Sequence, residues 1–323
     1  MFKRIYTKFL NWKVVSNFIT FLKRIILPGF DGLPFFEVIV FFIKGIQKGS
    51  LTSRAAATAF NFFLAIFPAI LFFFTIIPYL PIENFQEILM SLLNDVLPKS
   101  AFETISSTIE DIILRKRGSL LSIGFIMALY FSTSGIRSLI VAFNSTFHAI
   151  EKRSTVKIYL ISLLLVIVLS IIIIVAITMI VIGTDVLEFL VAKGLIKGYF
   201  SYFLIQFVKW IVIIAMVFFI ISFIYYLAPA HIQRFRFFSA GSTLATVLSI
   251  VTSLGFDFYV TNFSRYNALY GSIGTLIVIM LWIYFNALIL LIGFELNASI
   301  QSAGVQNSID KLKKKNKLEQ NFD

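Results

Sequence analysis

The sequence contains no cysteine and only two histidines, His148 and His231, among its 323 residues. The missing cysteine excludes disulfide bonds, thiolate metal sites and a cysteine nucleophile. A metal-dependent nuclease needs several carboxylates and histidines around its metal ions, and two histidines in separate predicted loops do not provide such a cluster. Walker, HExxH, GxSxG and dinucleotide-binding motifs are also absent. The sequence therefore predicts no cofactor, no metal site, no catalytic residues and no enzymatic activity.

Charged side chains are scarce as well. They make up 14% of the chain, against about 25% in an average soluble domain, while 59% of the residues are hydrophobic. This composition indicates an integral membrane protein. The net charge of +12 is explained by basic segments that flank the membrane and attract anionic lipid. Membrane lipids, and not nucleic acid, are therefore the expected partners.

Segments of membrane-spanning length occur six times, each longer than the roughly 20 residues that cross a bilayer as a helix. They cover residues 55–80, 119–144, 158–183, 203–227, 237–260 and 272–297. Residues 1–48 contain shorter amphipathic segments that suit an interfacial position, and residues 81–117 form an outer amphipathic helical segment. The predicted fold is an all-α integral membrane protein with six transmembrane helices at 49–300, followed by a basic, disordered cytosolic tail at 301–323.

The distribution of basic residues predicts the orientation. Six spans leave both termini on one side of the membrane, and 19 of the 28 Lys and Arg residues flank that side. The loops on the other side hold seven. Since loops rich in Lys and Arg remain in the cytoplasm, both termini are predicted to be cytoplasmic.

The second span carries an arginine within its apolar sequence. Counted at the helical rise, Arg137 lies roughly 9 Å from the nearer end of the span, and a charge at the centre of a span costs about 2.5–3.5 kcal/mol. One helical face holds this arginine together with Tyr130, Ser134, Val141, Asn144 and His148. We expect this face to meet protein or water and Arg137 to pair, or share a polar partner, with Glu295. We also expect the guanidinium to face a cavity open to the cytoplasm and to attract an anion such as a lipid phosphate.

Polar residues at the ends of the spans form two predicted clusters. The inner cluster, toward the cytoplasm, consists of Arg54, Thr58, Asn61, Arg137, Asn144, Glu295 and Asn297. The outer cluster consists of Gln206, Lys209, Asp257, Arg265, Tyr266 and Asn267. The small residues Gly241, Ala245, Ser249, Gly271 and Gly274 are predicted to let helices approach closely. The clusters are either the two ends of a translocation path or hydrogen-bonding groups that hold the helices in register.

Three stretches also resemble a known family. They are LTSRAAATAFNFFLAIFPAILFF from Leu51, ALYFSTSGIRSLIVAFNSTFHAIEKRS from Ala128 and FDFYVTNFSRYNALYGSIGTLIVIMLWIYFNALILLIGFELNASI from Phe256. They are similar to the YihY/BrkB family of bacterial inner-membrane proteins, once labelled ribonuclease BN, over residues 49–298. The resemblance implies a six-helix protein of the bacterial cell membrane, for which transport of small molecules or lipid-like compounds has been proposed. It implies no catalytic residues.

Three functions follow as hypotheses. The favoured one is a transporter or flippase-like protein for an amphiphile or a small anionic solute. The alternative is a membrane scaffold or envelope-organising protein without transport, and a membrane enzyme is the least favoured. The sequence leaves a homo-oligomer open. A transport path requires the polar faces of several spans to line one cavity, whereas a scaffold would pack them dry.

Overall fold

The computed structural model describes residues 20–21, 23–48, 50–76, 118–145, 153–193, 198–230, 237–262 and 272–319. Every regular element in these ranges is a helix: α3 (Phe35–Lys48), α4 (Leu51–Ile76), α7 (Gly118–Asn144), α8 (Thr155–Ala192), α9 (Gly198–Leu227), α10 (Ala240–Asn262) and α12 (Ser272–Glu319). Six of these, all but α3, are long and apolar enough to cross a membrane. The prediction of an all-α integral membrane protein with six spans is confirmed. The amphipathic segments predicted within 1–19 and 81–117 lie outside the described residues.

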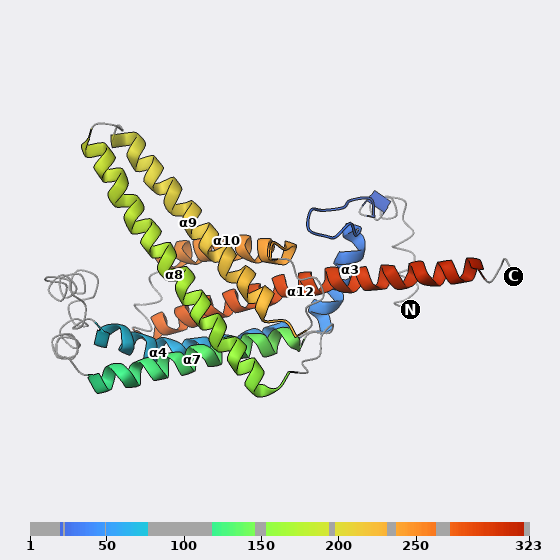
Figure 1. Cartoon of the computed structure of the whole chain (residues 1–323), viewed down its shortest axis with the longest axis horizontal. Coiled ribbons are helices and arrows are strands. Elements are labelled where there is room, and N and C mark those ends of the chain that lie inside the picture. The colour runs from blue at the N-terminus through green and yellow to red at the C-terminus, as the bar shows by residue number, and fades with distance from the viewer. Residues whose placement is uncertain are drawn as a thin grey trace.

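The six spans are helical because lipid offers no hydrogen-bond partner, so each backbone polar group needs a partner within its own segment. Their lengths differ. α8 has 38 residues and α9 has 30, which at the helical rise is about 57 and 45 Å, longer than the roughly 30 Å hydrocarbon core. Spans of this length are accommodated by tilting, and Figure 1 shows α8 and α9 inclined steeply to the other spans.

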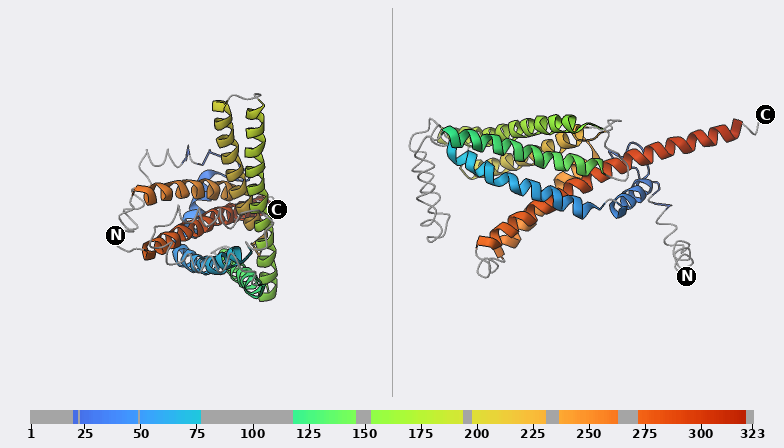
Figure 2. Two further views of the ribbon diagram at one scale, coloured as in Figure 1. Left: turned by 90° about the vertical axis from the view of Figure 1, so that its left-hand side faces the viewer. Right: turned by 90° about the horizontal axis from the view of Figure 1, so that it is seen from below.

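The spans are arranged as three helical hairpins. α4 packs on α7, α8 on α9 and α10 on α12, and the contacts from α7 to α8, α9 to α10 and α12 to α4 close a ring. We call the end where α7 and α9 finish and α10 begins the closed end, and the opposite end the open end. Toward the open end the α8–α9 hairpin leans away from the other two (Figures 1 and 2).

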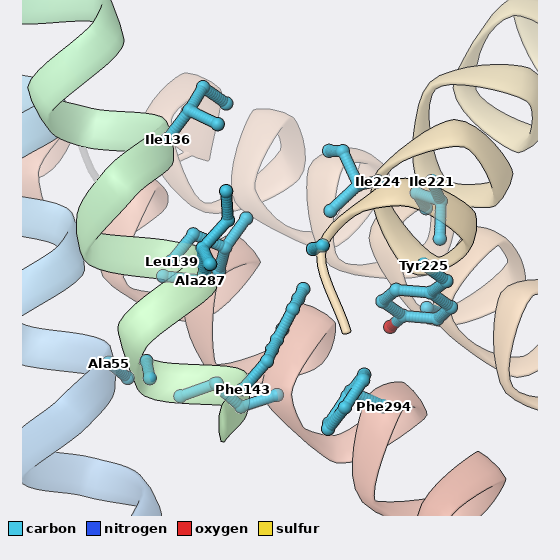
Figure 3. Packing of buried hydrophobic residues seen from close by; sticks show 14 of the residues in the cluster. Ala55, Ile136, Leu139, Phe143, Ile221, Ile224, Tyr225, Ala287 and Phe294 are labelled. Atoms are coloured by element: carbon cyan, nitrogen blue, oxygen red, sulfur yellow. The ribbon is translucent and has the colours of Figure 1, made fainter. Parts of the chain in front are cut away.

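The hydrophobic core lies at the closed end. The rings of Phe143 and Phe294 stack with centroids 4.4 Å apart, and Tyr225 packs edge-on against both. The Tyr225 hydroxyl donates a 2.6 Å hydrogen bond to the Leu290 carbonyl. All three aromatic side chains are at most 2% exposed (Figure 3). They therefore join α7, α9 and α12 in one packed layer.

Toward the open end each hairpin keeps its own contacts while its other faces are exposed. Phe72 of α4 lies over Gly124 of α7, and Ser253 of α10 accepts a hydrogen bond from the Trp282 indole of α12. Large apolar side chains on several faces of α8, α9, α10 and α12 are exposed there, among them Ile173, Ile174, Val175, Phe203, Phe207, Leu254, Phe258, Leu276, Ile277, Ile279 and Leu281. The three hairpins therefore diverge from a common base.

The last helix extends beyond the ring. Residues 301–319, for which the sequence predicted disorder, continue α12 to Glu319. Ile300 and Ala303 are buried with Phe30, Leu33 and Val38, so α3 and the turn before it cover the first part of this extension. Farther along, the Gln306 amide donates to the Asp310 carboxylate one turn later. The prediction of disorder considered only the polarity of the segment. It did not include the contacts of Ile300 and Ala303 with α3 and the turn before it.

Candidate functional site: polar contacts at the closed end

Arg54 of α4 connects three helices. Its Nη1 donates a 2.5 Å hydrogen bond to the Ala142 carbonyl of α7, one of the last carbonyls of that helix, which have no partner within it. Its charge also interacts with that of Glu295 on α12. The carboxylate of Glu295 is fully buried. A buried carboxylate is destabilised when no opposite charge is near, so the positive charge of Arg54 favours the charged form of Glu295.

Gly45 of α3 completes this site. A Cβ atom at Gly45 would overlap the Glu295 carboxylate, so the α3 backbone lies directly over that group. The sequence prediction did not include Gly45. A glycine within an amphipathic helix was the available signal, since such a residue usually has a packing reason. Four helices, α3, α4, α7 and α12, therefore meet around the buried Glu295 carboxylate and the Arg54 side chain.

The predicted pairing of Arg137 with Glu295 is wrong. Arg137 is exposed on α7, as are Tyr130 and Val141 on the same face, while Glu295 interacts with Arg54. The rotation of α7 is set by its other side, where Gly135 lies against the Phe62 ring and Leu139 is fully buried. The polar face of α7 therefore points out of the bundle around Arg137.

Asn144 lies on that polar face but is buried, because the segment after α9 covers it. Its side-chain Nδ2 donates to the Ala228 carbonyl at 3.2 Å, and its Oδ1 accepts from the Ala230 amide at 2.8 Å. Arg153 donates to the same Ala228 carbonyl at 2.7 Å. Asn144 thus holds the start of the α9–α10 connection against the end of α7.

Asn297 makes the equivalent contact at the other end of that connection. Its Oδ1 accepts a 2.8 Å hydrogen bond from the Gly241 amide, and its Nδ2 donates to Ser239 Oγ at 2.9 Å. Two asparagines on different helices therefore hold the two ends of the α9–α10 connection. Both use the amide oxygen and the amide nitrogen, so both polar atoms of each buried side chain are satisfied.

Small residues let α10 and α12 approach closely beside Asn297. A Cβ at Gly241 would overlap the Gly293 carbonyl, and a Cβ at Gly293 would lie 2.8 Å from that of Ala245. Ser249, one turn farther, is buried. Of the other two predicted packing residues, Gly274 is buried and Gly271 lies outside the described residues. The four-residue spacing of small residues in α10 coincides with this helix crossing.

The remaining residues of the inner cluster make smaller contacts. Thr58 is fully buried and its hydroxyl lies 3.5 Å from that of Ser138 on α7. Asn61 donates to the Ala57 carbonyl of its own helix at 2.9 Å. The inner cluster is thus divided into the interacting charges of Arg54 and Glu295, the Asn144 and Asn297 contacts, the Thr58 contact to α7, and the separate residues Asn61 and Arg137.

The outer cluster is only partly described. Gln206 is half-buried, whereas Lys209 and Asp257 are exposed on α9 and α10. Within the described ranges no hydrogen bond or ion pair links these three side chains. Arg265, Tyr266 and Asn267 lie outside them, as do both histidines. In the part of the chain that the structure describes, no three His, Asp or Glu side chains are grouped so that they could hold a metal ion.

These observations define a multi-pass helical membrane protein whose polar residues are concentrated where the helices converge. The family described as "Virulence factor BrkB" matches residues 42–318, and the chain belongs to this family. The resemblance read from the sequence is thereby confirmed.

Curated relatives agree with this assignment. The chain is 30% identical to the ribonuclease-like protein YfkH of Bacillus subtilis (strain 168), over 76% of this chain and 88% of that protein. It is 34% identical to the UPF0761 membrane protein IL2447 of Idiomarina loihiensis, over 31% of this chain and 36% of that protein. It is also 35% identical to the UPF0761 membrane protein XAC0937 of Xanthomonas axonopodis pv. citri, over 27% of this chain and 21% of that protein. No solved structure matches the chain.

Proposed function

We propose that the protein is a transporter or flippase-like protein that moves an amphiphile or a small anionic solute across the bacterial inner membrane. The observation that supports this proposal is the difference between the two ends of the ring. Phe143, Tyr225 and Phe294 pack against one another at one end (Figure 3), and toward the other end the α8–α9 hairpin leans away from the other helices (Figure 1). A transporter that alternates access between two sides needs one closed gate at a time, and packed hairpins can move as units.

We propose that the closed end faces the cytoplasm and that both termini are cytoplasmic. The support is the excess of Lys and Arg, 19 of 28, on the side that carries the termini. Because the chain lacks cysteine, single cysteines at Ser308 and Ser100 report orientation directly. A membrane-impermeant thiol reagent applied to intact cells is expected to label Ser100→Cys and to leave Ser308→Cys unlabelled. Labelling of both positions contradicts the orientation.

An amphiphile is the favoured substrate because of the residues near the open end. The exposed side chains of α8, α9 and α12 there are mostly apolar, which suits an acyl chain better than a hydrated solute. Arg137 lies toward the opposite, closed end: it stands seven residues before the end of α7, roughly 10 Å from it, and can extend its guanidinium toward the headgroups on that side. A lipid phosphate matches the geometry of the guanidinium. Anionic lipid is therefore the proposed partner.

Movement of fluorescent lipid analogues in vesicles that contain the purified protein tests this function. An anionic analogue is expected to cross faster than a zwitterionic one. Arg137→Lys is expected to slow the anionic analogue several-fold, because the charge remains while the two-pronged geometry is lost. Lys157→Gln, which removes an exposed charge in the first turn of α8, serves as the control and is expected to leave transport unchanged. No protein-dependent movement of either analogue contradicts the proposal.

A non-transporting scaffold is the second candidate, favoured by a different observation. Asn144, Asn297 and Arg54 use their polar groups to join helices at the closed end. Dry contacts of this kind suit a rigid membrane anchor. If the vesicles show no transport while Asn297→Ala still disrupts the fold, the scaffold is the better account.

A further inference from the structure

Glu295 is a carboxylic acid inside a membrane span. The apolar stretch of α12 runs from Leu276 to Lys313, and Glu295 is fully buried within it. Ionisable groups inside membrane proteins are costly, and those that persist there mark pathways for protons and other ions. Transport against a gradient needs a source of energy, and the sequence has no nucleotide-binding motif. A buried acid is therefore the residue to consider for coupling to an ion gradient.

Two opposite effects act on the protonation of Glu295. Its removal from water favours the neutral acid, whereas the positive charge of Arg54 favours the carboxylate. The α3 backbone at Gly45 lies directly over the carboxyl group and keeps it from water. Because the two effects oppose each other, a movement of α3 or α4 that changes either one also changes the protonation of Glu295.

The neighbouring helices carry other titratable side chains in the part of the chain that the structure describes. Three of them are exposed, namely Lys44 of α3, Arg137 of α7 and Asp257 of α10. Glu37 of α3 is half-buried and lies eight residues, roughly 12 Å, before Gly45. The hydroxyl of Tyr225 on α9 is bonded to a carbonyl of α12. Among these groups and Arg54, the charge that acts on Glu295 is that of Arg54.

Buried hydroxyl groups lie between α4 and α7 on the way from this site toward the open end. Thr58 stands one turn after Arg54, and its hydroxyl lies 3.5 Å from that of Ser138. Thr133 precedes Ser138 by roughly 8 Å along α7 and is fully buried, and its hydroxyl has no hydrogen-bond partner among the described residues. A hydroxyl both donates and accepts hydrogen bonds, so it can pass a proton onward. These three residues therefore suit the movement of protons toward Glu295.

We propose that Glu295 binds a proton that enters from the open end, and that protonation of its carboxylate releases the closed end. Protonation removes the attraction between Glu295 and Arg54. Arg54 keeps its hydrogen bond to the Ala142 carbonyl, so α4 and α7 stay together while α12 separates from them. The inference rests on the proposed function, because it takes the closed end to be the gate of a transporter.

One opening moves one proton. A proton from the outer solution adds to the carboxylate of Glu295, the closed end opens, and the same proton leaves to the cytoplasm. The carboxylate that remains attracts Arg54 again and the closed end re-forms. The proton gradient across the membrane thus supplies the energy for opening, and the charge on Glu295 returns to its initial value at the end of each cycle.

Infrared difference spectroscopy of the purified full-length protein tests proton binding directly. Spectra recorded in mildly acidic and mildly alkaline buffer are expected to differ by the C=O band of a buried carboxylic acid, which appears on acidification. Glu295→Gln is expected to remove this band. Asp310→Asn, which replaces an exposed acid on the same helix, is the matched control and is expected to leave it. A protein without the band, or a band that Glu295→Gln leaves unchanged, overturns the proposal.

A cysteine beside Glu295 reports the release of the closed end and needs no change at Glu295 itself. Ser299 is one turn after Glu295 and fully buried, so Ser299→Cys is a nearly isosteric reporter, and the exposed Ser308→Cys is its control. On acidification the maleimide reactivity of Ser299→Cys is expected to rise at least tenfold relative to that of Ser308→Cys. With Glu295→Gln, which resembles the protonated acid, it should be high at both pH values. A ratio that does not change with pH overturns the proposal.

The vesicle assay separates this inference from the proposed function. Acid outside the vesicles is expected to speed movement of the anionic lipid analogue several-fold compared with equal pH on both sides. Lipid movement that depends neither on the pH difference nor on Glu295 overturns the inference and leaves the proposed function in place. Exposure of Ser299→Cys at acidic pH without any lipid movement has the opposite meaning, because proton-dependent opening then holds while transport of lipid fails.

Discussion

On α10, Gly241 at the closed end lies against the Gly293 carbonyl, whereas Gly255 at the open end has no atom within 4 Å of the place a Cβ would occupy. The two glycines belong to one helix that is apolar enough to span the membrane. Hydrophobicity therefore does not decide where the helices pack, because lipid is as apolar as a leucine side chain. Close approach of small residues and hydrogen bonds between helices decide it, and both are concentrated at the closed end.

Replacing an aromatic residue should give the largest difference between the closed end and the open end in the free energy of unfolding that is lost. Phe294→Ala leaves a cavity beneath Phe143 and Tyr225 and is expected to lower the free energy of unfolding by about 3–4 kcal/mol. Phe258→Ala, on the exposed face of α10 toward the open end, is expected to change it by less than about 0.5 kcal/mol. Unfolding in mixed micelles titrated with dodecyl sulfate measures both. Equal losses would mean that the open end is packed as tightly as the closed end.

Adding a side chain on α10 tests close approach rather than cavity formation. Gly241→Val forces the backbones of α10 and α12 apart and is expected to cost about 2–3 kcal/mol. Gly255→Val places the same side chain in open space and is expected to cost less than about 0.5 kcal/mol. The same unfolding titration compares the two variants. If Gly241→Val is tolerated, the helices do not cross at Gly293 as described.

Replacing Arg54 and Arg137 in turn separates the effect of a charge between helices from the effect of a charge on the surface. Arg54→Gln removes a positive charge that interacts with the buried Glu295 carboxylate, together with the hydrogen bond to the Ala142 carbonyl, and is expected to destabilise the protein by about 2 kcal/mol or more. Arg137→Gln removes an exposed guanidinium and is expected to leave unfolding unchanged while slowing anionic lipid movement. Thermal unfolding in detergent and the vesicle assay together separate these effects. The opposite result, with Arg137→Gln the destabilising variant, would restore the pairing first expected from the sequence.

Removing a hydrogen bond between segments should give the smallest difference in the free energy of unfolding, relative to removing one within a single helix. Asn144→Ala leaves the Ala230 amide without its acceptor and is expected to cost about 1–2 kcal/mol. Asn286→Ala removes an amide that donates to the Trp282 carbonyl of its own helix, at 2.9 Å, and is expected to cost less than about 0.5 kcal/mol. Proteolysis between α9 and α10 offers a second measurement, since only Asn144→Ala should accelerate cleavage there. Cleavage at the same rate in both variants would argue against the role of Asn144.

The positions of the six spans could be predicted because they depend on local sequence. A run of about 20 apolar residues must be helical in lipid, whatever surrounds it. The small residues Gly241, Ala245 and Ser249 could be found for a related reason, since their four-residue spacing is visible without knowledge of the partner helix. Asn144, Asn297 and Glu295 were also recognised as polar groups in apolar surroundings, although their partners were not.

The partners depend on helix rotation and crossing, which the sequence by itself does not determine. Arg54 and Arg137 carry the same side chain near the same end of the bundle, so local sequence favours neither as the partner of Glu295. The structure distinguishes them because α7 turns Gly135 and Leu139 inward and thereby turns Arg137 outward. The role of Gly45 also depends on the tertiary structure. Only because α3 lies over Glu295 must this position lack a side chain. Hydropathy thus determined which segments enter the membrane, and packing of small residues against backbone decided which polar groups meet.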